Sequence, residues 1–180
     1  MNTKVLVSLA MLIGIGAVLH AVVPPILFGM KPDMLLTMMF LGIMLFPEKK
    51  NVFVLAIATG IVSALTTNFL GGQVANMIDK PITAFLFFGL FLAVRKLNQS
   101  VASAAVLTAI GTMISGTVFL GSVMILFGLP GGASFLALFT TVVLPTTVFN
   151  TVAMIVIYPI VSAILKRSKI TVPRSNSFEG

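Results

Sequence analysis

Residues 101–127 read VASAAVLTAIGTMISGTVFLGSVMILF and contain no charged side chain. An α-helix needs about 20 predominantly apolar residues to cross the hydrocarbon core of a bilayer. This stretch meets that length, so it predicts a membrane-spanning helix that is followed by a glycine-rich turn at residues 128–132. The same criterion can be applied to the rest of the chain.

Five further apolar stretches are found in this way: residues 5–23, 34–46, 52–70, 81–94 and 135–165. Two of them are short. We expect the helix of 34–46 to begin at Pro32, since proline is favoured in the first helical turn. The helix of 81–94 follows a polar loop at 73–80, and a start nearer Ala75 would lengthen it.

The last apolar stretch is too long for one straight helix. Proline breaks or kinks a helix from within, so Pro145 is expected to divide the stretch into a short outer piece and a final span from about Thr146. The sequence therefore predicts an all-α membrane protein with six transmembrane helices. We expect one domain at residues 1–165 and a polar cytoplasmic tail at residues 166–180.

The charged residues orient these helices. Basic residues fill the termini and every second gap between apolar stretches: Lys4, Lys49, Lys50, Arg95, Lys96, Lys166, Arg167, Lys169 and Arg174. The other gaps hold Lys31 and Lys80, each accompanied by an acid, Asp33 or Asp79. Cytoplasmic loops of membrane proteins carry an excess of Lys and Arg, so this pattern places both termini in the cytoplasm.

Composition excludes several classes of protein. Of the 180 residues, 58% are hydrophobic and 8% are charged, whereas soluble domains contain about 25% charged residues. The net charge of +7 comes from basic residues in ones and twos at helix ends. That arrangement fits anionic lipid and not nucleic acid. The first apolar stretch lacks a signal-peptide cleavage site and is expected to remain as a helix.

Signatures of enzymes and of metal sites are absent from the sequence. It shows no nucleophile–base pair, no phosphate-binding loop and no metal-ligand spacing, and it contains a single histidine and no cysteine. We therefore predict a protein that is not an enzyme and needs no cofactor. The histidine, His20, lies one turn before a Pro-Pro pair and is expected to be a helix-end hydrogen-bond donor.

Two polar motifs lie in the outer gaps. Met30-Lys31-Pro32-Asp33-Met34 occupies the first and Asn76-Met77-Ile78-Asp79-Lys80-Pro81 the second, with Asn68 at the outer end of the third helix. A zwitterionic amino acid needs an anion, a cation or helix amino terminus, and an apolar slot, all of which these motifs offer. An aspartate near a helix start also caps backbone N–H groups, and both interpretations stay open.

Further polar and flexible side chains have two interpretations each. The Asn150 amide is costly at membrane depth unless it is bonded, so it serves either a binding site or a bridge between helices. Methionines 30, 34 and 38 repeat every four residues and, with Met77 and phenylalanines 85, 87 and 88, would form an adaptable wall for an aromatic ring. Lipid-facing filler is the alternative.

Small residues recur at four-residue spacing in the first and fifth helices. The pairs are Ala10 with Gly14, Gly111 with Ser115, and Thr112 with Gly116. Such pairs let helices approach closely. Most of them are expected to serve internal packing, and on the first helix Ala10 and Gly14 offer a docking face for another membrane protein.

The two outer motifs, together with Ser63-Ala64-Leu65-Thr66-Thr67 and Gly128-Leu129-Pro130-Gly131-Gly132, resemble the tryptophan transporter family of Gram-positive bacteria, the TrpP type. The resemblance covers about residues 4–165. That family is similar to the substrate-binding S-components of energy-coupling-factor (ECF) transporters, which have six helices and both ends inside. It implies tryptophan uptake across the bacterial cytoplasmic membrane by an S-component-like bundle. The implied partners are a transmembrane coupling subunit and two cytoplasmic ATPases.

The resemblance also implies roles for individual residues. Binding near the outer side gives weight to Asn68, Asn76, Asp79, Lys80 and Asn150. Asp79 is expected to meet the substrate ammonium, while Lys80 or a helix start meets the carboxylate. An asparagine would take the indole N–H, with Met and Phe side chains around the ring. Ala10 and Gly14 would face the coupling subunit, with Gly in place of a commoner Ala.

Two other functions compete with uptake through an ECF complex. A stand-alone secondary carrier would need a coupling-ion site at mid-membrane, and the sequence shows no acid within an apolar stretch to serve as one. A non-transporting membrane adaptor would bind no small molecule, and its outer aspartates would act as helix caps alone.

Overall fold

The computed structural model describes residues 2–24, 31–95 and 100–167. Throughout these ranges the secondary structure is helical, with these elements: α1 (Thr3–Val22), α2 (Met34–Leu45), α3 (Lys49–Thr66), α4 (Gly72–Val94), α5 (Val101–Leu126), η1 (Pro130–Gly132), α6 (Phe135–Leu138), η2 (Phe139–Val143) and α7 (Leu144–Arg167). Met30, Lys96, Lys169, Arg174 and most of the predicted tail lie outside the described residues. The all-α membrane bundle is confirmed.

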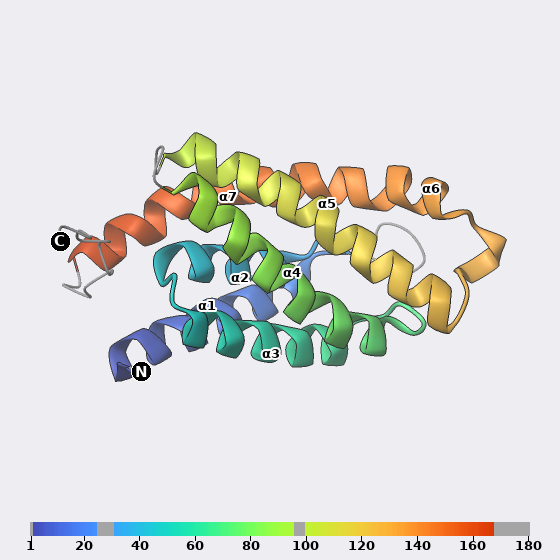
Figure 1. The fold of residues 1–180 in the computed structure, drawn as a ribbon, viewed down its shortest axis with the longest axis horizontal. Helices are drawn as coiled ribbons and strands as arrows, with labels where there is room; N and C mark the ends of the chain where they lie inside the picture. Colours follow the sequence, from blue (N-terminus) through green and yellow to red (C-terminus); the bar gives the residue numbers. More distant parts are fainter. Residues whose placement is uncertain (1, 25–30, 96–99, 168–180) are drawn as a thin grey trace.

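The helices run back and forth along the long axis of the molecule, and α6, η2 and α7 together form the last rod (Figure 1). Both ends of the described chain lie at the same end of the bundle (Figure 1), as six crossings require. Basic residues Lys49, Lys50 and Arg95 flank the helix ends there. We assign this end to the cytoplasm because positive residues favour that side.

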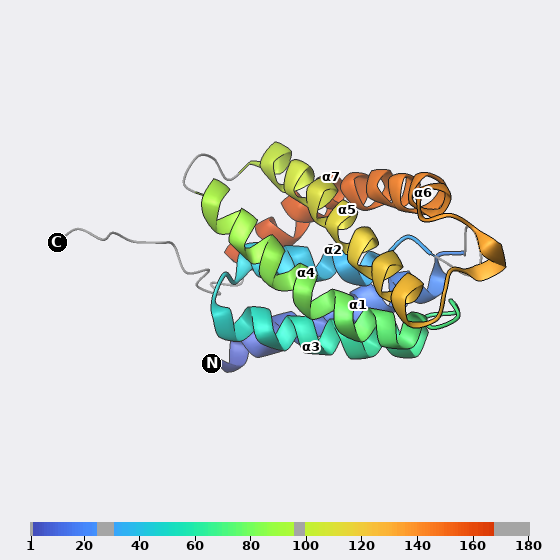
Figure 2. The same ribbon diagram turned by 45° about the vertical axis from the view of Figure 1, so that its right-hand side comes forward.

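Helix α2 forms the centre of the bundle (Figures 1 and 2). All of its residues are buried, and it contacts α1, α3, α4, α5 and α7. At 1.5 Å per residue its 12 residues span about 18 Å, which is less than the roughly 30 Å of a hydrocarbon core. Its outer end is therefore recessed between longer neighbours, and Asp33 caps it there.

One predicted helix start was wrong, because helix α2 begins at Met34 after the Asp33 cap and not at Pro32. Helix α4 begins at Gly72 and runs through Pro81, close to the earlier start that the sequence offered near Ala75. The predicted polar loop at 73–80 is therefore helical. The polar residues of this segment remain in a buried helix because they find partners, as described below. Gly71, with φ of 75°, supplies the left-handed residue that precedes α4.

Helix α3 is also shifted from its prediction, since it begins at Lys49 and ends at Thr66 instead of covering residues 52–70. The polar residues Lys49, Lys50 and Asn51 form its first turn, which hydropathy alone assigned to a loop. The chain then leaves the helix at Thr67, which places residues 67–71 at the outer end of the bundle.

The last rod is divided before Pro145, but it does not leave the helical path. A π-helical turn, η2, joins α6 to α7, and the Leu144 N–H donates to the Phe139 carbonyl five residues back. Proline lacks an N–H and clashes with the carbonyl four residues before it, so a wider turn accommodates Pro145 without a break. Single π turns are rare and often occur at functional sites.

The inner half of the core depends on a close approach of α5. Phe40 and Phe87 stack with ring centroids 4.0 Å apart and planes 10° from parallel. Gly111 lies against this pair, and a Cβ atom there would come within 2.7 Å of both rings. The small residue at 111 therefore serves internal packing, which is one of the roles that the sequence offered.

We predict that Gly111→Ala destabilises the protein by about 1–3 kcal/mol, because the added methyl overpacks the phenylalanine pair. Thermal unfolding in detergent is the measurement, and the midpoint is expected to fall. Gly121→Ala on the same helix is the matched control, since a Cβ there meets no described atom within 4 Å. Equal midpoints for the two variants would contradict this account of the packing.

Candidate functional site

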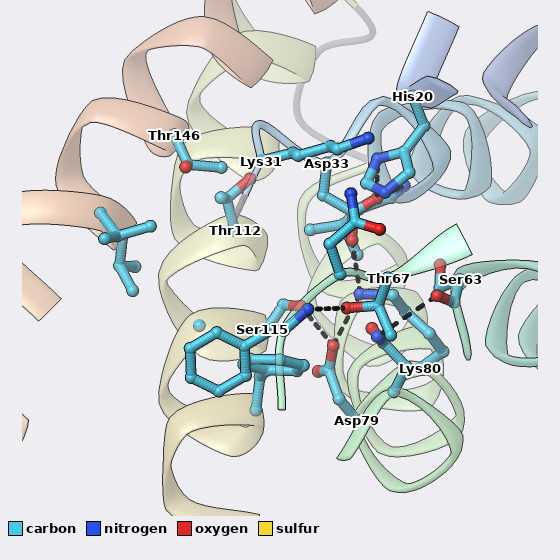
Figure 3. A pocket seen from close by; sticks show the side chains of 18 residues that line it. His20, Lys31, Asp33, Ser63, Thr67, Asp79, Lys80, Thr112, Ser115 and Thr146 are labelled. Atoms are coloured by element: carbon cyan, nitrogen blue, oxygen red, sulfur yellow. Dashed lines mark hydrogen bonds and ion pairs between the residues drawn. The ribbon is translucent and has the colours of Figure 1, made fainter. Parts of the chain in front are cut away.

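A pocket opens at the end of the bundle opposite the basic residues, among the residues that precede α2 and those that join α3 to α4. Figure 3 shows the side chains that line it. The empty space between its lining atoms is about 650 Å³, a volume that includes the open mouth. Its walls come from α1, α3, α4, α5, η2 and α7, and Leu36 of the recessed α2 contributes to them. The short central helix thus leaves the space that the longer helices surround.

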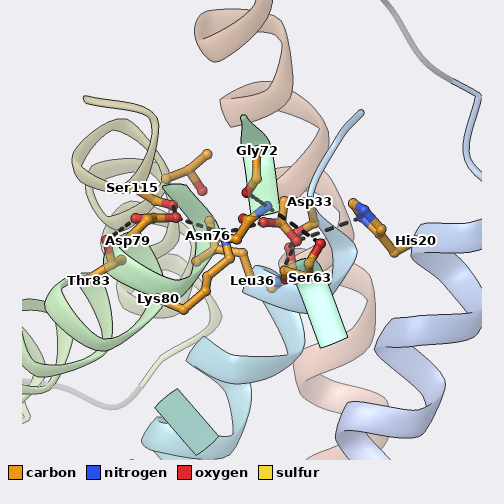
Figure 4. Close-up of polar contacts among 12 residues, drawn as sticks. His20, Asp33, Leu36, Ser63, Gly72, Asn76, Asp79, Lys80, Thr83 and Ser115 are labelled. Atoms are coloured by element: carbon orange, nitrogen blue, oxygen red, sulfur yellow. Dashed lines mark hydrogen bonds and ion pairs between the residues drawn. The ribbon is translucent and has the colours of Figure 1, made fainter. Parts of the chain in front are cut away.

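Three charged residues form one cluster beside the pocket (Figure 4). The Lys80 Nζ atom lies 2.6 Å from Asp33 Oδ2 and 2.8 Å from Asp79 Oδ2. Lys80 is 2% exposed and Asp79 is fully buried. Charges at such depth are stable only when they are paired and hydrogen-bonded. The cluster ties the amino end of α2 to the middle of α4.

The Asp79 carboxylate is filled by donors from the protein. Besides Lys80, it accepts hydrogen bonds from Thr83 Oγ1 and Ser115 Oγ, each at 2.7 Å. Ser115 belongs to α5, so this carboxylate connects α4 with α5. Asp33 is more open: its side chain is 17% exposed, and Oδ1 accepts from the Leu36 N–H at 2.9 Å in capping α2.

The pocket holds two further basic side chains. His20 and Lys31 line it with Asp33 (Figure 3), and His20 Nδ1 lies 3.8 Å from Asp33 Oδ1. His20 is buried, and its Nδ1 atom has no hydrogen-bond partner within the described part of the chain. One lysine, Lys80, is shared by two carboxylates, so the buried cluster carries one excess negative charge next to Lys31.

The apolar wall of the pocket differs from the predicted one. It contains Phe69 and Phe119, whose ring centroids lie 5.6 Å apart at 59°, with Val142 and Val143 from η2. The methionines and phenylalanines that the sequence suggested lie elsewhere: Met34, Met38, Phe87 and Phe88 are in the core, while Met77 and Phe85 are on the surface. Of these six side chains, only Met77 and Phe85 are exposed to lipid, which is the alternative that the sequence left open.

The structure brings most of the predicted binding residues to this pocket. Six of them line it: Lys31, Asp33, Asn68, Asn76, Asp79 and Lys80. The Asn76 Nδ2 atom donates to the Gly72 carbonyl at 2.8 Å and reaches the Ser63 carbonyl of α3 at 3.5 Å. Asn68 is exposed at the mouth. Met77 is 43% exposed and does not line the pocket.

The remaining predicted residues have other positions. Asn150 is fully buried behind the pocket wall, and its Nδ2 atom lies 3.3 Å from Thr112 Oγ1 of α5. It thus bridges α7 and α5. Ala10 and Gly14 lie on the exposed face of α1. A Cβ atom on Gly14 would meet no described atom within 4 Å.

Several pocket residues were missed from the sequence. They are His20, Ser63, Thr112, Ser115, Gly116, Phe119 and Thr146, with apolar neighbours Leu36, Phe69, Val142 and Val143. Ser115, Thr112 and Gly116 were noted only as small packing residues. The sequence does not show whether a hydroxyl inside an apolar helix contacts a ligand or donates to the backbone of its own helix. Thr117 does the latter, since its hydroxyl donates to the Met113 carbonyl.

The described residues contain no group of three His, Cys, Asp or Glu side chains that is arranged to hold a metal ion. The polar chemistry of the pocket thus consists of two carboxylates, two amines, an imidazole, amides and hydroxyls. This set suits an organic ligand that carries charges of both signs.

Comparisons with known proteins agree on one family. The family model described as tryptophan transporter TrpP matches residues 2–166. A probable tryptophan transport protein of Bacillus subtilis (strain 168) is 60% identical over 168 residues, covering 93% of this chain and 96% of that protein. Proteins of the same description from Clostridium acetobutylicum and Clostridium perfringens are 43% and 40% identical, covering 88% and 94% of this chain and 91% and 97% of theirs. No solved structure matches significantly.

We predict that Lys80→Met destabilises the protein by about 3–5 kcal/mol, because it leaves two buried carboxylates without their shared cation. The double variant Lys80→Met/Asp79→Asn restores the net charge of the wild-type cluster and is expected to recover part of the loss. Thermal unfolding and the yield of monodisperse protein in detergent are the measurements. A single variant as stable as the wild type would show that the cluster does not hold the bundle together.

Proposed function

Because this chain belongs to the TrpP family of tryptophan transporters, we propose that its outer pocket binds tryptophan and that the protein is the substrate-binding S-component of an ECF-type transporter. The observation that carries the binding part is the pocket itself. It combines a net negative charge on the Asp33–Lys80–Asp79 cluster, a lysine (Lys31) that forms no ion pair with the described residues, and an aromatic wall at the outer end of a multi-pass membrane bundle.

The charges of the pocket match a zwitterion. Asp33 and Asp79 share the single positive charge of Lys80, so these three residues carry one net negative charge, and Lys31 adds a positive charge to the same pocket. We assign the substrate ammonium to Asp33, because the expected partner Asp79 already accepts from three donors. The carboxylate is assigned to Lys31 and to the third N–H of Lys80, since an ammonium group has three donors and two are used.

The aromatic ring is assigned to the apolar side of the pocket. Phe69 and Phe119 offer tilted ring faces, and Val142 and Val143 complete the wall. Aromatic rings prefer offset or edge-to-face contacts, which a pair of phenylalanines at 59° provides. Apolar contact alone would not separate tryptophan from phenylalanine by much.

The S-component role is proposed from the exposed face of α1. Ala10 and Gly14 are one turn apart on that face, and the space beside Gly14 is open. Small residues let a partner helix approach the backbone closely in a membrane. His20 of the same helix contacts the pocket through Asp33, so α1 reaches both the substrate site and the proposed interface with a coupling subunit. Two cytoplasmic ATPases would supply the energy.

A second candidate function is supported by one specific observation. The sequence suggested no acid within an apolar helix, but Asp79 lies inside α4 and is fully buried, and it shares Lys80 with Asp33, which in turn lies near His20. Ionisable groups within the membrane are typical of ion-coupled carriers. A stand-alone secondary carrier is therefore the alternative that uptake measurements must separate.

We predict that purified wild-type protein binds tryptophan at least about 100-fold more tightly than tryptamine or indole-3-propionate, because each of these leaves one charged group of the pocket unpaired. Isothermal titration in detergent is the measurement. Asp33→Asn keeps the α2 cap and is expected to weaken tryptophan binding about 10-fold or more. Lys50→Gln, at the exposed inner end, is the control. Unchanged affinity in Asp33→Asn would rule out the assigned ammonium partner.

We predict that the coupling subunit and both ATPases co-purify with the wild-type protein from native membranes, and that Ala10→Leu/Gly14→Leu abolishes this association while tryptophan binding is retained. Leucine side chains would fill the space that a partner helix needs. Gly121→Leu is the matched control, since its Cβ also meets no described atom within 4 Å. Mass spectrometry identifies the subunits.

Reconstitution separates the two candidate functions. In proteoliposomes, ATP-dependent tryptophan uptake that needs the partner subunits is the expected result. Uptake by the purified protein alone, driven by an ion gradient, would overturn the S-component proposal in favour of the carrier.

A further inference from the structure

Three buried polar atoms on α7 have no hydrogen-bond partner in the described structure, and two of them, on Thr146 and Asn150, belong to residues one turn apart. Thr146 lines the pocket and is 7% exposed, and its Oγ1 atom makes no hydrogen bond to any described residue. Asn150, one turn further along α7, is fully buried, and its Oδ1 atom is likewise unpartnered among the described residues. Its Nδ2 atom is held by Thr112, another pocket residue.

Unpartnered buried polar atoms are uncommon in proteins, and the described residues of this chain contain eight, among them His20 Nδ1 and Ser63 Oγ of the pocket. More than about 90% of buried polar groups in proteins are hydrogen-bonded, and each failure costs about 1–3 kcal/mol. The neighbouring Thr147 shows the usual solution, because its hydroxyl donates to the Val143 carbonyl at 2.8 Å. Lipid offers no replacement partner at this depth. Thr146 and Asn150 thus retain a hydrogen-bonding capacity that a ligand in the pocket can use.

The position of Thr146 suits the far end of a bound substrate. Figure 3 shows Thr112 and Thr146 on one side of the pocket, with Ser63 and Lys80 on the other. The π-helical turn η2 places Val142 and Val143 in the wall just before Thr146. Gly116 of α5 packs against Val143 so closely that a Cβ atom would overlap it. The apolar wall and Thr146 therefore line the same side of the pocket.

We propose that Thr146 is a specificity-determining residue that accepts the indole N–H of tryptophan on its Oγ1 atom, with Asn150 as its positioning residue. The proposal rests on the proposed tryptophan binding. In the bound state the Thr146 hydroxyl would turn to donate its hydrogen to Asn150 Oδ1, which the i, i+4 spacing places on the same face of α7. The two atoms are not hydrogen-bonded to each other in the structure. Asn150 Nδ2 remains on Thr112. This series of hydrogen bonds would give both Thr146 Oγ1 and Asn150 Oδ1 a partner.

The chemistry of the groups fixes the direction of each hydrogen bond. An indole N–H is a donor only, a hydroxyl both donates and accepts, and an amide oxygen accepts. A site that hydrogen-bonds a substrate N–H rejects an analogue that lacks it, because the protein group is then left unpaired. Phenylalanine has no ring N–H, and in benzothienylalanine a sulfur atom replaces it. Neither ligand would donate a hydrogen bond to Thr146 Oγ1.

The test is competition binding to the purified full-length protein with tryptophan and β-(3-benzothienyl)alanine. Wild type is expected to prefer tryptophan by about 10-fold or more. Thr146→Val keeps the shape of the side chain and should bring this ratio close to one by weakening tryptophan alone. Asn150→Ala should also lower the ratio. Thr147→Val is the matched control, and Thr146→Ser, which retains a hydroxyl, should keep the preference.

The outcomes separate the proposals. Tryptophan binding with no preference over benzothienylalanine in the wild type, or an unchanged ratio in folded Thr146→Val, would overturn the role of Thr146 and leave the proposed function intact. Equal loss of both ligands in Asn150→Ala would overturn its positioning role. Absence of tryptophan binding in the wild type would overturn the proposed function and this inference together. If Thr146→Val fails to fold, a ratio near one in Thr146→Ser would overturn the role of its hydroxyl.

Discussion

The shared contact of Lys80 with Asp33 and Asp79 is the interaction on which the outer half of the bundle depends. It joins the cap of α2 to the middle of α4, and the Ser115 hydroxyl extends the connection to α5. Three charges inside a lipid-embedded bundle are tolerated only because each is held at hydrogen-bonding distance by the others. The cluster thus stabilises the helices and sets the charge of the pocket with the same atoms.

The short α2 helix explains why the cluster lies where a ligand can reach it. An apolar helix of 12 residues is fully enclosed by longer neighbours, so its outer end forms the floor of a pocket and not part of the membrane surface. The π turn before Pro145 has a matching effect on the opposite wall, where it presents Val142, Val143 and Thr146. One side of the pocket is ionic, and the other is apolar with one hydroxyl. An aromatic amino acid is divided in the same way, into charged ammonium and carboxylate groups and an apolar ring.

The sequence was sufficient to predict the helical membrane bundle, in which five helices are long and apolar enough to cross a membrane and α2 is a shorter apolar helix, because apolar stretches are local features. It was not sufficient to show that residues 73–80 are helical. Lys80 is paired with Asp33 across 47 residues, and that partner makes a charged turn stable inside the bundle. Ser115 and Thr146 were missed for the same reason: the role of a hydroxyl is decided by the neighbouring helix and not by its own.

The environment of Asp79 bears on the source of energy for transport. A coupling carboxylate in an ion-driven carrier has to gain and lose its cation during each cycle. Asp79 is bound by Lys80, Thr83 and Ser115 at 2.7–2.8 Å, and removing these donors from a buried carboxylate would cost several kcal/mol. Asp33 has an exposed edge but remains paired with Lys80. Such a closed arrangement differs from the exchangeable carboxylate that an ion-driven carrier needs, and it suits a fixed structural role for Asp79.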